Sequence, residues 1–175
     1  MAVSSGVDLI AHLPGTAVRS DSAIPRFEIA DRDAALAARR GVIVVPTAWL
    51  ATQDRIAGGD TAQVRRTREV QRHNLALLRR AGVPLAVGSD LFVTASHEAA
   101  YLLELGGVNA TELLRMWTET TARAAFPARK LGRLQPGFEA SLLALACDPI
   151  ADFACTKQIT LRMKQGRLLP MGSRP

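Results

Sequence analysis

Three apolar runs in the chain each end in polar residues, and the types of those residues are suited to metal chemistry. The runs span residues 7–11, 42–45 and 83–87, and they are followed by His12, by Pro46-Thr47 and by Ser89-Asp90. If the runs are parallel strands, their carboxyl ends share one edge of a sheet. Neutral imidazole and carboxylate are ordinary zinc ligands, and a carboxylate beside metal-activated water can accept its proton. His12 and Asp90 are therefore candidate metal ligands, and Asp90 is also a candidate general base.

Each candidate also has an ordinary structural interpretation. A histidine after a strand is commonly a hydrogen-bonded loop residue, and a Ser-Asp pair often caps the turn that follows. His97-Glu98 could simply begin a helix, and His73 lies among arginines on a helix, where we expect it to be exposed. The residue types alone leave these alternatives open.

The elements that would position these residues alternate between helices and strands. A helix is expected within residues 28–40, with acids early and arginines late as the helix dipole favours, and Gly41 is placed to cap it. A second helix is expected from Asp60-Thr61 to Arg80, closed by Ala81-Gly82. The runs 42–45 and 83–87 lack polar alternation, which is typical of strands buried on both faces. This order predicts βαβ units and an α/β fold.

The predicted elements change from helices to antiparallel strands after Lys130. Helices are predicted at residues 96–105, from a capping box at Asn109 to Met116 or Trp117, and at 120–128. Extended segments at 141–145 and 158–170, with turns at Pro136-Gly137 and Gln165-Gly166, predict a small antiparallel sheet. The expected domains are residues 1–130 and 131–175.

Composition limits the function classes. The 175 residues are 48% hydrophobic, enough for a core, and we expect neither a membrane helix nor a secretion signal. The net charge is +6, and positive charge is concentrated in one predicted helix, where it is opposed only by Glu69; its arginines are at positions 65, 66, 68, 72, 79 and 80. We expect this to be a solvated helix face, because aromatic residues for nucleic-acid stacking make up only 5%. Cys147 and Cys155 form no CxxC pair, so two reduced thiols in a cytoplasmic protein are expected.

Several segments together resemble one family. They are "SSGVDLIAHLPG", "RRAGVPLAVGSD", "HEAAYLLELGGVNATELLRMWTETTARAAF", "LGRLQPGFEASLLALACDPIADF" and "ITLRMKQGRLL". In this order they resemble the C-terminal part of the amidohydrolase superfamily, within its imidazolonepropionase-like branch. The signature positions are Thr118, Ala122, Arg123, Gly132, Pro136-Gly137 and Asp148-Pro149. The sequence departs from the family pattern at Ser141, where the family carries an acid in a structural role.

The resemblance implies a fold, a chemistry and a set of residue roles. It implies strands six to eight of a (β/α)8 TIM barrel with their helices, followed by strands of a small accessory β-sandwich. It also implies metal-dependent hydrolysis of non-peptide C–N bonds, as in cyclic amides, amidines or ureas, with one or two divalent ions, expected to be zinc. By this resemblance His12 is the strand-six ligand, Asp90 is the strand-eight ligand and base, and His97 lies at a helix start near the small-molecule substrate.

Other family residues have no counterpart here. The HxH pair of strand one, the lysine of strand four and the histidine of strand five are missing, and a full barrel needs about 250 residues. We therefore expect a C-terminal fragment that is inactive alone, with the other half supplied in trans, or self-association through an open strand edge. The alternative is a non-catalytic remnant or an interaction module. A third, weaker hypothesis is nucleic-acid binding through residues 65–80; the main expectation is no nucleic-acid and no membrane partner.

Overall fold

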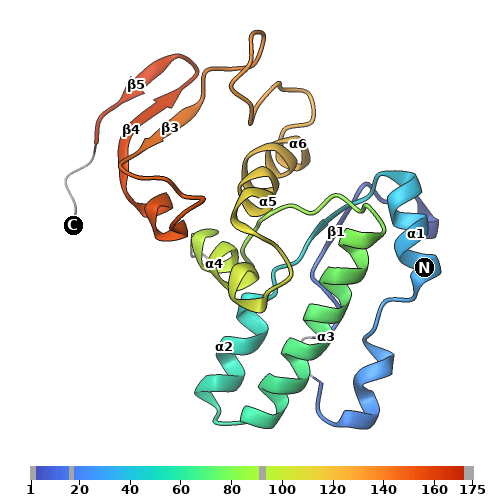
Figure 1. Ribbon diagram of the computed structural model, residues 1–175. Coiled ribbons are helices and arrows are strands. Elements are labelled where there is room, and N and C mark those ends of the chain that lie inside the picture. The colour runs from blue at the N-terminus through green and yellow to red at the C-terminus, as the bar shows by residue number, and fades with distance from the viewer. Residues whose placement is uncertain (1–2, 16–17, 91–93, 172–175) are drawn as a thin grey trace. The chain divides into compact units, whose positions relative to one another are not determined.

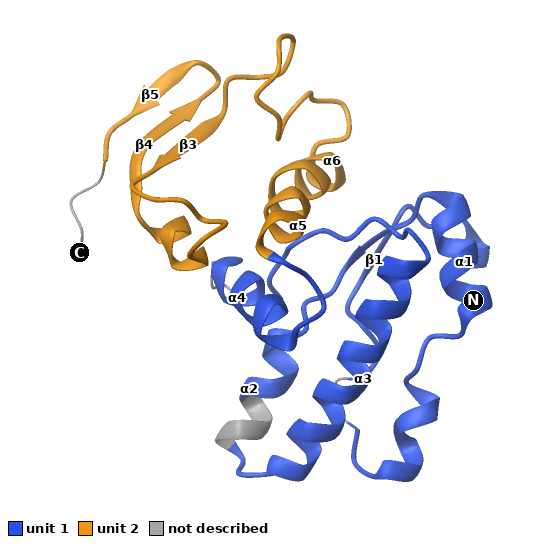
Figure 2. Ribbon diagram, in the orientation of Figure 1, with its two compact units in different colours: residues 1–109 blue, residues 110–175 orange. Residues whose placement is uncertain are grey.

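The computed structural model describes residues 3–15, 18–90 and 94–171, without the side chains of 54–57. The chain forms two compact units, residues 1–109 and 110–175 (Figure 2). The domain boundary expected at residue 130 stays a prediction. In the described part of the chain, no helix combines the length and apolar character needed to cross a membrane.

A small parallel sheet lies at the centre of the first unit. Strand β1 (Leu9–Ala11) pairs in parallel with β2 (Ile43–Val45), with Ile10 opposite Val44. The run at 83–87 adds one parallel bridge, from Leu85 to the other side of Val44, through two backbone hydrogen bonds of 2.9 Å. The predicted parallel order is confirmed, and the third run is buried as expected but forms a bridge rather than a full strand.

Helices of the first unit pack beside this sheet (Figure 1). They are the 3-10 helices η1 (Val3–Ser5) and η2 (Asp21–Arg26) and the α-helices α1 (Asp31–Arg40), α2 (Trp49–Ala57), α3 (Thr61–Arg80) and α4 (Ser96–Leu105). The predicted caps are confirmed, because Gly41 has a left-handed φ of 66° and the Asp60 carboxylate accepts a hydrogen bond from the backbone N–H of Gln63. Helix α2 has no counterpart among the expected elements, and α3 packs against both α1 and α2.

The basic helix α3 is exposed to solvent on one side and also forms hydrogen bonds to neighbouring segments. Its apolar side chains, such as Leu75 and Leu78, are buried. The Arg66 side chain is 12% exposed and donates to the backbone oxygens of residues 18 and 19, at 3.0 Å each. Arg72 and Arg79 donate to the carbonyls of residues 105 and 107. The helix face that we expected to be solvated therefore also holds neighbouring segments in place. Its arginines donate hydrogen bonds to backbone carbonyls of connecting segments, which need such donors.

The second unit begins with one uninterrupted helical stretch. Helix α5 (Ala110–Arg115) runs into the π-helical turn η3 (Met116–Thr120) and then into α6 (Thr121–Ala125). The expectation of two helices separated near residue 118 is wrong. The extra residue of the wider turn is accommodated by π-type bonding, in which the Thr121 N–H donates to the Met116 carbonyl.

An antiparallel sheet completes the second unit, as predicted (Figure 1). Its strands are β3 (Leu142–Leu145), β4 (Ile159–Lys164) and β5 (Arg167–Leu169), in that order, with the 3-10 helix η4 (Phe153–Lys157) between β3 and β4. The turn at Gln165-Gly166 is confirmed by positive φ values of 52° and 75°.

Two signature positions of the second unit have structural roles. A Cβ at Gly132 would lie 2.3 Å from the Thr118 carbonyl oxygen, so only glycine fits there. Ser141, which departs from the family pattern, donates to Glu139 at 2.6 Å and accepts from the Gln165 N–H at 3.0 Å. The hydroxyl can therefore bridge the loop to the hairpin turn without an acid.

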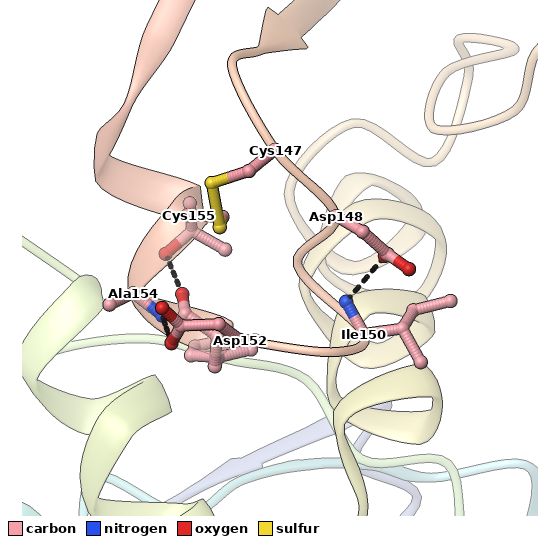
Figure 3. The surroundings of a disulfide bond; sticks show 8 residues. Cys147, Asp148, Ile150, Asp152, Ala154 and Cys155 are labelled. Atoms are coloured by element: carbon pink, nitrogen blue, oxygen red, sulfur yellow. Dashed lines mark hydrogen bonds between the residues drawn. A yellow bond between two sulfur atoms is a disulfide. The ribbon is translucent and has the colours of Figure 1, made fainter.

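The two cysteines are paired, so the expectation of reduced thiols is wrong. Cys147 follows β3 and Cys155 lies in η4 just before β4; they form a disulfide with Cα atoms 5.5 Å apart (Figure 3). Antiparallel pairing of β3 with β4 puts both residues at one end of the sheet, and Asp148 and Asp152 fold the intervening loop by accepting N–H groups two residues ahead. Disulfides are typical of oxidising compartments, and the expected cytoplasmic location stays a prediction.

We predict that the unreduced chain takes up no iodoacetamide and that the reduced, unfolded chain takes up two equivalents, measured by intact mass. Reduction should lower the free energy of unfolding by about 2–3 kcal/mol, because the bridge closes a short loop in the unfolded chain. The Cys147→Ser/Cys155→Ser double variant is the control and should not respond to reductant. Alkylation of the unreduced folded chain would contradict the pairing.

Candidate functional site

The ends of the parallel strands bring the two predicted ligands together. His12 Nε2 lies 4.0 Å from Asp90 Oδ1, and the two side chains are 52% and 48% exposed. His12 Nδ1 lies 2.6 Å from the hydroxyl oxygen of Thr47, at the end of the strand between them. The sheet edge therefore gathers polar side chains from all three strand ends, as the sequence predicts, while the roles of His12 and Asp90 stay predictions.

The backbone fixes the histidine end of this edge. Hydrogen bonds of 2.9 Å from the N–H groups of His12 and Leu13 to the carbonyls of Val45 and Pro46 extend the β1–β2 pairing past the strands. His12 and Thr47 then adopt left-handed φ values of 71° and 45°. Such values are uncommon for residues other than glycine, cost of order 1–3 kcal/mol each, and occur often at functional sites.

Close packing fixes the aspartate end. A Cβ at Gly88 would lie 2.8 Å from Val45 Cγ1, so glycine lets the third run approach β2 directly. Valine is stiff about χ1, and it could not move aside cheaply for a larger residue at position 88. Asp90 follows two residues later, which places it at the same edge as His12.

A buried carboxylate, which the sequence argument did not single out, holds the segment after β2. Glu98 on α4 is 2% exposed, and its two oxygens accept the N–H groups of Ala48 at 2.7 Å and Trp49 at 2.8 Å. Burial raises the pKa of Glu98, and the two backbone hydrogen bonds oppose that rise. A signal was present in the sequence, because Glu98 shares a helix face with Leu102 and Leu105, where an acid is unusual.

The same segment is held from its other side. Gln71 on α3 donates to the Ala48 carbonyl at 3.0 Å and accepts the hydroxyl of Tyr101 at 2.5 Å. Burial raises the pKa of Tyr101 to about 12. Both the N–H and the carbonyl of Ala48 are therefore bound by buried side chains, which fixes the backbone one residue after Thr47.

His97, the candidate substrate-binding residue, lies against an aromatic ring. Its ring stacks on Trp49 with centroids 5.1 Å apart, at the starts of α4 and α2. Trp49 lies two residues after Thr47 in the chain, and His97 is not part of the His12–Asp90 pair.

The donor pair is compatible with a shared divalent ion. One ion reaches both atoms only if they are closer than the sum of two ligand bonds, about 4.2 Å for zinc; 4.0 Å meets this limit. A tetrahedral site would draw the two atoms to about 3.4 Å. Within residues 3–15, 18–90 and 94–171, no three histidine, cysteine or acidic side chains group to hold a metal. The pair therefore fits as part of a metal site, not as a whole one.

Comparison with known proteins identifies the family. The model of the amidohydrolase family matches residues 13–169, and the chain belongs to this family. The match begins one residue after His12. No curated protein matches the sequence. The finer placement in the imidazolonepropionase-like branch stays a prediction.

Several solved structures similar to the chain carry the names of hydrolases. An amidohydrolase shares 28% identity with a TM-score of 0.69, over 96% of this chain and 41% of that one. A prolidase bound to N-methylphosphonate-L-proline shares 25% identity with a TM-score of 0.69 over the same shares. Ochratoxinase from A. niger, at 21% identity, TM-score 0.74 and shares of 95% and 38%, supports the fold alone. The chain spans about two fifths of the length of these proteins.

We predict that Glu98→Gln lowers the free energy of unfolding by about 1–3 kcal/mol, because glutamine offers one acceptor to two buried N–H groups. The raised pKa of Glu98 also gives the wild type a pH dependence. Above its ordinary value of 4.5 the folded chain binds this proton more tightly than the unfolded chain, so wild-type stability falls as pH rises until Glu98 ionises. The penalty of the substitution should therefore be larger at low pH than at neutral pH in urea denaturation. A penalty that grew with pH would contradict this assignment.

Proposed function

We propose that this chain is the C-terminal part of a metal-dependent hydrolase that cleaves carbon–nitrogen bonds. The observation that carries the proposal is the 4.0 Å approach of His12 Nε2 to Asp90 Oδ1 at the carboxyl ends of parallel strands. Membership of the amidohydrolase family supports it. So does the similarity to hydrolases of comparable fold.

The residues take the following roles in this proposal. His12 Nε2 and Asp90 Oδ1 would hold a divalent metal, with zinc as the expected ion, which would supply an activated water and polarise the scissile bond. Asp90 would accept a proton from the attacking water and pass it to the departing nitrogen. His97, stacked on Trp49, borders the substrate.

The proposed substrates are small molecules with an amide-like C–N bond. Non-peptide substrates such as cyclic amides, amidines and ureas are the first class. A neighbour at 25% identity is a prolidase, so Xaa-Pro dipeptides are the second class to test. Both classes break the bond to a nitrogen that needs a proton to depart, which is the task given to Asp90.

The chain is proposed to be inactive by itself. A catalytic zinc site has three protein ligands, and the described residues bring two candidate donors together. The chain also spans about two fifths of its neighbours. The remaining ligands would come from chain outside these 175 residues, in the same polypeptide or in trans.

A non-catalytic interaction module is the second candidate. The observation that favours it is apolar exposure on the β3–β4–β5 sheet, where the residues Leu143 and Leu168 are 57% and 65% exposed. A free, folded chain would gain from covering such residues. This candidate predicts association without metal affinity.

We predict that the chain binds one Zn²⁺ weakly through His12 and Asp90, measured by calorimetric titration of the metal-free chain. His12→Ala and Asp90→Asn should each weaken binding about tenfold or more, because each removes one of two donors. His73→Ala is the matched control, since His73 is also half-exposed and lies 3.9 Å from a carboxylate, that of Glu28. Equal effects of all three substitutions would contradict the proposed site.

We predict hydrolysis when the chain is combined with the part of the 28%-identical amidohydrolase that it does not cover, assayed with cyclic amides, ureas and Xaa-Pro dipeptides. Asp90→Asn should lower kcat by about 10²–10⁴-fold, the range expected for loss of a general base. Asp33→Asn, at an aspartate of similar exposure on α1, should leave kcat unchanged. Activity that survived Asp90→Asn would exclude Asp90 as the base.

A further inference from the structure

The geometry points to Thr47 as the residue that sets the tautomer of His12 and so prepares Nε2 to bind a metal. The inference rests on the proposed function and adds a positioning residue to it. Thr47 donates no atom to the metal; it acts through the imidazole of His12. The evidence is a count of the hydrogen atoms available between three groups at the ends of β1 and β2.

The Thr47 hydroxyl has a single hydrogen and lies within hydrogen-bond distance of two partners. Thr47 Oγ1 donates to the Pro46 carbonyl oxygen at 2.9 Å. The same Oγ1 lies 2.6 Å from His12 Nδ1. Both contacts can be hydrogen bonds at the same time only if the hydroxyl donates to the carbonyl oxygen, which can only accept, and Oγ1 accepts from the imidazole. In this arrangement Nδ1 carries a proton, which in a neutral imidazole leaves Nε2 with its lone pair.

The contact on the other side of the imidazole is too long to be a hydrogen bond that would fix the opposite tautomer. Nε2 faces Asp90 Oδ1 at 4.0 Å, which is too long for a hydrogen bond. A proton on Nε2 would point towards Asp90 Oδ1 without forming a hydrogen bond to it. With a lone pair on Nε2, the imidazole and the carboxylate each offer one metal-ligand atom, and the two atoms are close enough for one ion to bind both.

The position of Thr47 is fixed from both directions along the chain. The Pro46 carbonyl that receives its hydrogen also accepts the Leu13 N–H at 2.9 Å. On the other side, Ala48 is bound through its N–H by Glu98 and through its carbonyl by Gln71. Thr47 lies between these anchors with φ 45°. The hydroxyl is therefore presented to His12 by a backbone that has little freedom to move.

The first test measures the tautomer directly. Histidine labelled with ¹⁵N in the ring gives long-range ¹H–¹⁵N correlations that separate a protonated from a bare ring nitrogen. At about pH 8.5, where an ordinary imidazole is neutral, the chain's three histidines are assigned with His73→Ala and His97→Ala. We expect His12 to show a protonated Nδ1 and a bare Nε2. A protonated Nε2 in the wild type overturns the inference, and no substitution at the site is needed for that result.

The second test compares two substitutions of Thr47. Thr47→Ser keeps the hydroxyl and should keep the Nδ1–H tautomer. Thr47→Val keeps the shape but removes the oxygen, and His12 should shift toward the mixture of an unconstrained imidazole. Backbone amide spectra show that each variant is folded. A folded Thr47→Val chain with an unchanged His12 tautomer overturns the inference.

Zinc titration separates this inference from the proposed function. Loss of the supporting hydrogen bond should weaken zinc binding about 10–100-fold in Thr47→Val, while Thr47→Ser stays near the wild type. A wild-type chain with the Nδ1–H tautomer and no zinc affinity would contradict the proposed metal site and leave the assignment of the tautomer standing. A chain that binds zinc through His12 equally well with valine at position 47 would contradict the role of Thr47 alone.

Discussion

The buried carboxylate of Glu98 is the interaction on which the candidate site depends. Placing an acid in a core is costly unless its oxygens are hydrogen-bonded, and here both oxygens bind N–H groups, those of Ala48 and Trp49. These N–H groups lie at the start of α2, where a helix has no internal acceptors for them and where its dipole favours negative charge. One hydrogen-bonded side chain of α4 thus offsets its own desolvation and also provides acceptors for the unpaired N–H groups at the start of α2. The conformation around Thr47 therefore depends on a residue about fifty positions later in the chain.

Helix α3 extends the same principle to the rest of the first unit. Connecting segments carry carbonyl and N–H groups that need partners, and α3 supplies many of them from polar side chains. Asn74 donates to the Phe27 carbonyl and accepts the Ile29 N–H, both at 2.8 Å, while Gln71 and Arg66 serve other segments. Part of the arginine content of this helix therefore has a structural role, because several of its guanidinium groups donate to backbone oxygens of the same unit.

The parts of the fold that follow from local pattern were predictable, and those that depend on distant partners were not. Apolar runs and caps such as Gly41 predict the strands and helices of the first unit, and the rule for parallel strand ends predicts that His12 and Asp90 meet. Glu98 binds backbone N–H groups at the start of another helix. The sequence shows that an acid lies on an otherwise apolar helix face, but it does not show which groups the acid binds. The pairing of Cys147 with Cys155 depends on the register of β3 with β4, which spacing alone does not fix. The π-helical turn at residues 116–120 likewise had no signal in the sequence pattern.

The two donors of the proposed metal site are already organised by the first unit. His12 is held by the backbone ladder and by Thr47, and Asp90 is placed by the tight approach of Gly88 to Val45. All of these constraints lie within residues 1–109, so the separation of the two donors does not need chain from elsewhere. Further ligands would then meet two donors whose ordering cost has been met on folding, and their binding energy would go into affinity rather than into arranging the first two. The left-handed backbone at His12 and Thr47 is consistent with this, because strain of that kind persists only where surrounding contacts over-determine it.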